Sequence, residues 1–419
     1  MEMRVGKTDS ALETMIGNDE YPILIICPKP LLYNWERDAK RYLPWLKIVT
    51  VEGSKKTKEE ILDSNTCQVY IVNWNIVAGY DVLNRKNWKQ IYLDESATMG
   101  SKKSTFCNYL LSCPKPPGQK RYALSGLPAP EGVKNLWPQM FFVDGHFLGY
   151  DSYILYMMNH WRMDLDRQDL VMIDPINHSR DILNYVHRNA FCASRKALGI
   201  GPQKKYEKLF VKPSPKQLQL ADLVKTTTRY KNRKNQSIEM IPIVRGNMYN
   251  QICSGIDPFY GEMFDNPKAK LIYDWYDEYR TPFIVLGFFV EQLRDTRNYL
   301  ESRGINCAYI DGDTRDMSHQ EDMFISGQAD AIIAQVRTVK MGKDYSRADD
   351  IFYISNSTWF DDRGQSEDRV VIATKKGTVR SWDIVVDQGA DERLADILTG
   401  TKRVNSDAVL NKMGSENYW

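Results

Sequence analysis

Several features that mark special classes of protein are missing from this chain. The longest apolar run, ILIICP at residues 23–28, is far shorter than the roughly 20 residues of a transmembrane helix. The seven cysteines are odd in number and include no C-x-x-C pair, which argues against a disulfide framework or a zinc site. There are no internal repeats and no low-complexity tracts. These absences favour a cytoplasmic protein with reduced thiols and no membrane partner.

An excess of charge of one sign is missing as well. The chain has 56 Lys and Arg against 54 Asp and Glu, so any site for a polyanion has to be a local patch. One basic stretch lies at residues 222–239, and it carries no acid between its two ends. Its cations are Lys225, Arg229, Lys231, Arg233 and Lys234. The stretch is either a solvated face or a surface that contacts a DNA backbone.

Apolar runs rich in β-formers alternate with helical patterns in two parts of the chain. The first part has predicted strands at residues 21–28, 46–53, 67–74, 89–96 and 119–128. The second part has them at residues 281–289, 305–314, 329–336, 349–357 and 378–386. Continuous apolar strands separated by helices indicate parallel sheets covered on both faces. The fold class is therefore predicted as α/β with two parallel-sheet domains.

The domain limits follow from these patterns. A length of 419 residues suggests two or three domains. We expect a first α/β domain at residues 1–145, a mainly helical insert at 146–265, a second α/β domain at 266–400 and a tail at 401–419.

The first eight residues, MEMRVGKT, contain part of a phosphate-binding loop. The pattern G-x-x-x-x-G-K-[ST] is met at Gly6, Lys7 and Thr8, but Met1 stands where the first glycine is usual. Taken alone, G-K-[ST] occurs by chance in roughly one chain in five of this length. A second element strengthens it: the strand YLDES at residues 92–96 ends in the adjacent carboxylates Asp94 and Glu95. A strand-end Asp that holds Mg²⁺ is typical of P-loop ATPases.

The stretch YALSGLPAPEGVKNLWPQMFFVD at residues 122–144 resembles the third motif of superfamily-two helicases of the Swi/Snf type. It is most similar to the compact versions that phages encode. Other segments resemble the remaining motifs in the right order over nearly the whole chain: EMRVGKT, CPKPLLYNW, VYIVNWNIV, LDES, QICSGI, FIVLGFF, IDGDTRD and residues 341–369.

This resemblance implies two tandem RecA-like domains that hydrolyse ATP with Mg²⁺. It assigns nucleotide binding to Arg4, Gly6, Lys7 and Thr8, and the metal to Thr8 and Asp94. It assigns catalysis to Glu95, Gln365 and Arg369, with Arg369 acting on the γ-phosphate. Coupling between nucleotide and nucleic acid would involve Ser125, Gly126, Gly342 and Asp344.

The implied partner is double-stranded DNA, tracked by its phosphates with little sequence preference. The implied contact residues are Lys29, Asn34, Asn73, Lys102, Gly312 and Thr314. A monomer is expected, in the host cytoplasm if the chain is phage-encoded.

The chain departs from the family pattern at several positions. Ala97 stands where His is usual, Leu127 where Thr is usual, and Ile372 where the last motif has a second arginine. That arginine is commonly the arginine finger, and Arg363 and Arg380 are candidates to replace it. The segment that reads adenine normally precedes the phosphate loop, so the N-terminus is expected to be truncated.

Three functions stay open at this point. The first is an active DNA-stimulated ATPase and translocase. The second is a degenerate relative that acts as a DNA-binding or interaction module with little turnover. The third is an RNA-directed helicase.

Overall fold

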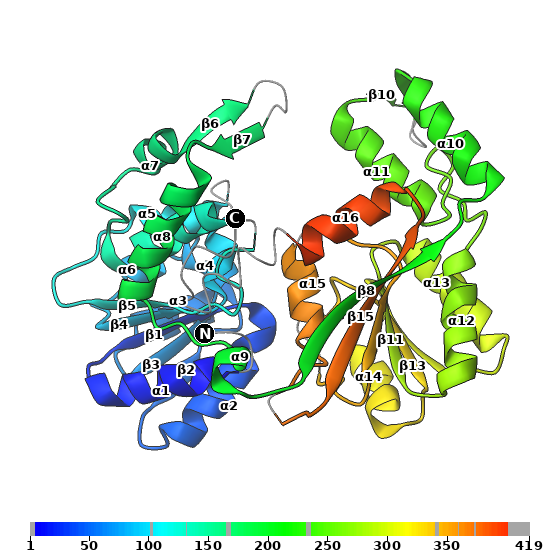
Figure 1. Ribbon diagram of the computed structural model, residues 1–419. Coiled ribbons are helices and arrows are strands. Elements are labelled where there is room, and N and C mark those ends of the chain that lie inside the picture. Colours follow the sequence, from blue (N-terminus) through cyan, green and yellow to red (C-terminus); the bar gives the residue numbers. More distant parts are fainter. Residues whose placement is uncertain are drawn as a thin grey trace. The chain divides into compact units, whose positions relative to one another are not determined.

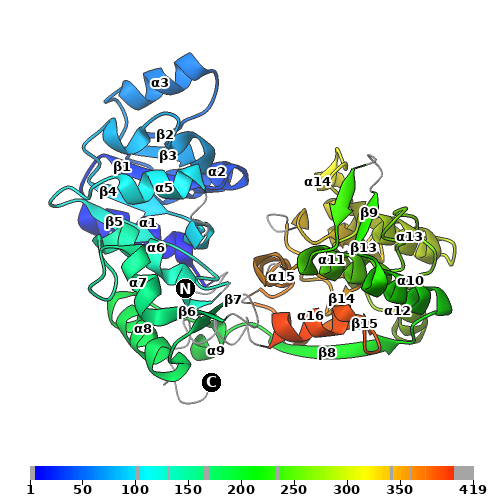
Figure 2. The ribbon, with the colours of Figure 1, turned by 90° about the horizontal axis from the view of Figure 1, so that it is seen from above.

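The computed structural model describes residues 5–400, apart from residues 101–103, 131, 165–168, 232–235, 340–342, 359 and 373. The chain forms two compact units, of which the first reaches to Gly199 and the second begins at Ile200. Figure 1 labels the elements of both units, and Figure 2 shows them from above.

A five-stranded parallel sheet is the centre of the first unit. Its strand order is β2-β3-β1-β4-β5. The strands are β1 (Ile23–Cys27), β2 (Ile48–Thr50), β3 (Val69–Asn73), β4 (Gln90–Leu93) and β5 (Lys120–Ala123). Each lies within one of the five ranges predicted from the sequence.

Both faces of this sheet are buried, which explains why β1 is apolar at every position. Ile23, Ile25 and Cys27 point into the core shared with α1 (Lys7–Asn18) and α2 (Leu32–Tyr42). Leu24 and Ile26 point into the opposite core, shared with α3 (Lys55–Asp63), α4 (Trp74–Val77), α5 (Thr105–Ser112) and α6 (Leu136–Asp144). Because side chains alternate along a strand, a strand covered on both faces needs an unbroken apolar run. Figure 1 shows α1 and α2 on one face and α5 and α6 on the other.

The rest of the first unit is an aromatic subdomain that follows α6. It consists of α7 (Tyr153–His160), the antiparallel pair β6 (Trp161–Asp164) and β7 (Asp169–Met172), α8 (Pro175–Asn189) and α9 (Arg195–Leu198). Its core is a separate cluster in which Trp137 and Met140 of α6 meet Tyr156 and Ile182.

The second unit contains a six-stranded parallel sheet with the order β12-β13-β11-β14-β15-β8. The strands are β8 (Gln203–Val211), β11 (Phe283–Gly287), β12 (Cys307–Ile310), β13 (Ala331–Gln335), β14 (Asp350–Tyr353) and β15 (Thr378–Val386). Helices α12 (Pro267–Tyr279) and α13 (Val290–Glu301) cover one face, and α14 (Met317–Ser326) packs on the other. The predicted α/β class with two parallel sheets is confirmed.

Helices α10 (Pro215–Thr226) and α11 (Pro242–Cys253) pack together beside the short antiparallel pair β9 (Arg229–Lys231) and β10 (Ser237–Glu239). The basic stretch therefore spans the end of α10 and this hairpin, and the side chains of Lys225 and Arg229 are exposed. Arg233 and Lys234 lie outside the described residues.

Residues 203–211 lie within the stretch predicted as a mainly helical insert, but they form β8, which pairs with β15 over nine residues. The strand QKKYEKLFV is polar over its first six residues, and only its end, at Leu209 and Val211, packs into the apolar core. Its alternate residues Lys204 and Tyr206 instead contact buried acids: Lys204 Nζ lies 3.0 Å from Asp368, and Tyr206 donates to Glu367 at 2.8 Å. This face is half-buried and held by polar contacts, so hydrophobic periodicity does not reveal it.

None of the seven cysteines, all of which lie in the described part of the chain, forms a disulfide, and five of them are buried. In the described part of the chain, no helix combines the length and apolar character needed to cross a membrane.

The aromatic subdomain contains a pair of histidines, from which we predict that the free energy of unfolding depends on pH. The rings of His160 and His178 lie 4.6 Å apart, and among the described residues neither Nδ1 has a hydrogen-bond partner. Burial, and after it the neighbouring His178, lowers the pKa of His160 to about 4. In the unfolded chain the pKa of this imidazole is about 6.5. The contribution of neutral His160 to the free energy of unfolding is therefore fully present above pH 6.5. It decreases as the pH falls toward 4, by up to about 3 kcal/mol.

Urea unfolding at pH 7.5 and pH 4.5 measures this loss. The variant His160→Phe keeps the ring and gives up no Nδ1 hydrogen bond, so we expect it to lose less stability on acidification than the wild type. The exposed His146→Phe is the control and is expected to behave like the wild type. Equal acid sensitivity in all three proteins would contradict the assignment to His160.

Candidate functional site

The ends of three neighbouring strands are held together by backbone hydrogen bonds in the first unit. Beyond the last residue of β4, Asp94 N–H donates to Ile26 of β1 at 2.9 Å. Leu124 N–H donates to Leu93 at 2.8 Å, and Ser96 N–H donates back to Leu124 at 2.8 Å. The carboxylates that follow β4 are therefore placed at the carboxyl edge of the sheet, where open α/β sheets bind their ligands.

Helix α1 begins at the same edge. Gly6 is its N-cap and has φ 81° and ψ 31°, a left-handed conformation that glycine adopts without strain. Lys7 and Thr8 are thereby placed in the first turn of the helix, where backbone N–H groups and the helix dipole favour an anion.

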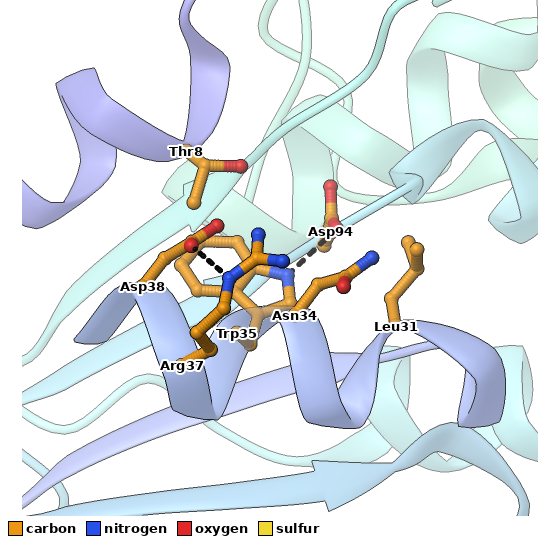
Figure 3. A pocket seen from close by; sticks show the side chains of 7 residues that line it. All are labelled: Thr8, Leu31, Asn34, Trp35, Arg37, Asp38 and Asp94. Carbon is orange, nitrogen blue, oxygen red and sulfur yellow. Dashed lines mark hydrogen bonds and ion pairs between the residues drawn. The ribbon is translucent and has the colours of Figure 1, made fainter. Parts of the chain in front are cut away.

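A cavity of about 160 Å³ brings predicted residues together (Figure 3). Thr8 and Asp94, the two predicted metal ligands, both line it, and so does Asn34, a predicted nucleic-acid contact. The other lining residues are Leu31, Trp35, Arg37 and Asp38. Burial and the nearby negative charge of Asp94 raise the pKa of the Cys27 thiol far above its usual range, so this thiol stays protonated.

Lys7 and Glu95 form an ion pair beside this cavity, with Lys7 Nζ 3.3 Å from Glu95 Oε1. Both side chains are largely buried, with 12% and 15% exposed. Glu95 has φ 50°, a conformation that costs a non-glycine residue about 1 kcal/mol. Its N–H donates to Asp94 Oδ1 at 2.9 Å, and its carbonyl accepts from Thr98, which helps to hold this turn.

A second contact links the turn after β4 to the segment that resembles the third motif. Ser96 Oγ lies 2.8 Å from Gln139 Oε1, and Gln139 Nε2 donates to the carbonyls of Pro128 and Asn135. Gln139 is not among the site residues predicted from the sequence, although it stands in the stretch LWPQM at residues 136–140. Ser125 and Gly126, the predicted coupling residues of this segment, are buried, and Ser125 Oγ accepts from Leu127 N–H at 3.2 Å.

The predicted nucleic-acid contacts differ in how their side chains are used. Lys29 and Asn34 are exposed on and next to α2. Asn73 caps α4 by accepting from Asn75 N–H at 2.9 Å. Thr314 donates to Asp311 at 3.0 Å in a turn where Gly312 is exposed. Lys102 lies outside the described residues, as do Arg4 and Gly342.

The remaining predicted site residues belong to the second unit. Gln365 lies on α15 (Phe360–Glu367), is 8% exposed and donates to Asp361 at 2.8 Å. Arg369 follows this helix, and its carbonyl accepts from Tyr345 N–H at 2.8 Å. Asp344 is exposed and accepts from Ser346 N–H.

The structure contradicts the suggestion that Arg363 replaces the missing motif arginine. Its guanidinium is 2% exposed and forms a two-pronged pair with Asp383 at 2.6 and 2.9 Å. It also contacts Glu367 at 3.0 Å and stacks 4.1 Å from the ring of Tyr353. Arg363 therefore belongs to the interior of its own unit.

Arg380 is also engaged within the second unit. It pairs with the buried Asp350 at 2.7 Å while remaining 37% exposed. Ile372, at the position of the usual arginine, is half-buried.

The fold defines the class of the protein as an α/β protein, with a candidate ligand site at the carboxyl ends of a parallel sheet. The chain belongs to the SNF2-related domain family, whose model matches residues 2–242, more than half of the chain. The predicted membership of the Swi/Snf-type helicase group is thereby confirmed at the level of the family.

Named relatives are consistent with this family. A Helicase SWR1 from Cryptococcus neoformans is 32% identical over 134 residues, covering 31% of this chain and 10% of the relative. The Uncharacterized ATP-dependent helicase MG018 from Mycoplasma genitalium is 22% identical over 414 residues, covering 94% of this chain and 38% of the relative. The chain thus spans less than half the length of these relatives. A solved structure, the Sulfolobus solfataricus SWI2/SNF2 ATPase core in complex with dsDNA, aligns with 99% of this chain and 88% of its own at 16% identity and a TM-score of 0.42.

The environment of Arg363 predicts a stability role. We expect Arg363→Met to lower the free energy of unfolding by about 3–5 kcal/mol, because it leaves the buried Asp383 without its cation and Glu367 with Lys204 alone. Arg380→Met is the matched control and should cost less, since Arg380 is partly solvated and Asp350 keeps the hydrogen bond from the Trp382 indole at 2.8 Å. Urea unfolding of the two variants tests this, and an equal or smaller loss for Arg363→Met would contradict the buried role.

Proposed function

We propose that the protein is an ATP-hydrolysing motor of the superfamily-two helicase type that moves along duplex DNA. The observation that carries the proposal is the cavity in which Thr8 and Asp94 meet, next to the Lys7–Glu95 ion pair. Membership of the SNF2-related domain family supports it, and so does similarity to a mycoplasmal protein named as an ATP-dependent helicase.

The donors at this cavity fit a magnesium ion. The Thr8 hydroxyl and the Asp94 carboxylate are hard oxygen donors, and Mg²⁺ is usually held by one or two carboxylates together with substrate phosphates and water. In the described ranges no group of three or more His, Cys, Asp or Glu side chains could hold a metal, so phosphate and water oxygens would complete the ligand set. When bound, such an ion neutralises charge on the transferred phosphoryl group.

The ion pair suggests how the site exchanges partners when ATP binds. The Lys7 ammonium would move from the Glu95 carboxylate to the β- and γ-phosphates, which carry more negative charge. Glu95, with one cation fewer, would then accept the proton of the attacking water. The helix start at Gly6 would add backbone N–H groups to the phosphate contacts.

Two assignments in the second unit rest on the resemblance alone. Gln365 and Arg369 would act on the γ-phosphate, and Asp344 would couple hydrolysis to movement.

The assignment of DNA contacts rests on the same resemblance. Lys29, Asn34 and Gly312, which are exposed, would contact DNA phosphates. The compact phage-encoded subtype, a monomeric state and the host cytoplasm remain predictions from the same resemblance.

A second function is favoured by one specific feature. Ile372 stands at the position where the family has a second arginine, and Arg363 forms a buried ion pair with Asp383. A protein without an arginine at this place would hydrolyse ATP slowly, since an arginine finger contributes about 10³–10⁵-fold in rate. The alternative is therefore a DNA-binding module with little turnover.

Phosphate release in the presence of duplex DNA separates the two functions. We expect the wild type to be stimulated by duplex DNA, and Lys7→Ala and Glu95→Gln each to lose about 10²-fold or more in rate. Lys56→Ala, an exposed lysine on α3, is the control and should keep full activity. Equal release from all four proteins would end the enzyme hypothesis, and equal stimulation by RNA would contradict the assignment to DNA.

The variant Ile372→Arg tests the missing arginine directly. If this position faces the γ-phosphate, restoring the guanidinium should accelerate hydrolysis by at least about tenfold. Ile372→Lys carries a charge without the guanidinium fork and should give a smaller gain. An unchanged rate for Ile372→Arg, in a variant with normal unfolding, would show that the position does not contribute to catalysis.

A further inference from the structure

A buried hydrogen bond ties the predicted metal ligand to a residue of α2. The indole Nε1 of Trp35 donates to Asp94 Oδ2 at 2.8 Å, and both side chains are buried, with 2% and 6% exposed (Figure 3). Hydrogen bonds from neutral donors to a carboxylate are stronger than neutral pairs, and more so where water is excluded. This contact therefore restrains how the Asp94 carboxylate can turn.

Both oxygens of Asp94 have a protein donor. Oδ2 accepts from Trp35, while Oδ1 accepts from the N–H of Glu95 at 2.9 Å. An ionised carboxylate has about four lone-pair positions, so each oxygen keeps one for a further partner. The two donors come from different elements, and rotating the carboxylate would break both bonds.

Helix α2 is well suited to hold the indole in place. Leu32, Trp35 and Ala39 share one face and pack into the core against β1 and β3. On the neighbouring face, Asn34 and Asp38 line the cavity that Asp94 also lines. The same helix thus supplies a wall of the cavity and the donor that orients its carboxylate.

We propose that Trp35 is a positioning residue that orients Asp94 for a divalent cation. This inference rests on the proposed function, because it takes Asp94 as a metal ligand. Removing a group that hydrogen-bonds to a metal ligand typically weakens metal affinity by about 10–100-fold. Trp35 acts through Asp94 and does not itself contact the ion.

The test uses Trp35→Phe, which keeps an aromatic ring in the core and removes the indole N–H. The matched control is Trp88→Phe in the same unit. Trp88 is fully buried and donates its indole N–H at 2.8 Å to the backbone carbonyl of Val82. Trp88→Phe therefore also loses one buried indole hydrogen bond, but this bond does not involve a carboxylate.

Manganese is the probe, added to the whole chain without nucleotide, and indole N–H signals are observed by nuclear magnetic resonance. The Trp35 signal is identified by its absence in Trp35→Phe. We expect Mn²⁺ to broaden this signal in the wild type and Asp94→Asn to abolish the broadening. The apparent Mn²⁺ affinity, measured by proton relaxation of water, should fall about tenfold in Trp35→Phe and stay unchanged in Trp88→Phe.

Two results would overturn the inference: an Mn²⁺ titration that leaves the Trp35 signal unchanged, or equal Mn²⁺ affinities in Trp35→Phe and Trp88→Phe. Phosphate release decides the proposed function separately. A wild type that releases no phosphate yet shows the Trp35-dependent Mn²⁺ affinity would remove the motor proposal and keep the positioning role. Normal DNA-stimulated hydrolysis, with the same metal dependence in Trp35→Phe and Trp88→Phe, would keep the motor proposal and remove the positioning role of Trp35.

Discussion

Three backbone hydrogen bonds at the carboxyl edge of the first sheet set the position of its candidate site. They join Asp94 to Ile26, Leu124 to Leu93, and Ser96 to Leu124. Parallel strands end at a common edge, so these bonds bring the residues after β1, β4 and β5 to one place. The Lys7–Glu95 pair, the Trp35–Asp94 bond and the Ser96–Gln139 bond all depend on this arrangement.

The second unit relies on buried charge to a degree that its composition does not suggest. Lys268 and Asp391 form an ion pair at 2.6 Å with almost no exposure, and Lys268 also donates to the carbonyl of Ile354. Arg363 and Glu367, one helical turn apart on α15, are likewise buried and paired. Arg363 also pairs with Asp383 of β15, and Glu367 accepts from Tyr206 of β8, so the helix that carries Gln365 is anchored to the sheet. Removing one partner from such a pair is costly because the other is left charged and buried.

Much of the fold and part of the site could be predicted from the sequence. The strands predicted on apolar runs are all present, since a strand buried on both faces needs such a run. Asp94 and Thr8 were predicted to bind one magnesium ion, and they line one cavity. Strand β8 escaped prediction because its partners are charged and lie more than 160 residues away in the chain. The role suggested for Arg363 was wrong because burial cannot be deduced from a charged residue in a polar stretch.

The sequence by itself determined the features that repeat locally: apolar strands, helical spacing, the glycine before Lys7 and the carboxylate pair after β4. Each of these depends on backbone conformation or on the alternation of side chains within a few residues. Only the tertiary structure decided which polar groups meet. Trp35 and Asp94 are 59 residues apart, and Lys204 and Asp368 are 164 apart. Such partners are chosen by the order of strands in the sheets and by the helices packed on them, because a buried polar group has to find its partner wherever the fold places one.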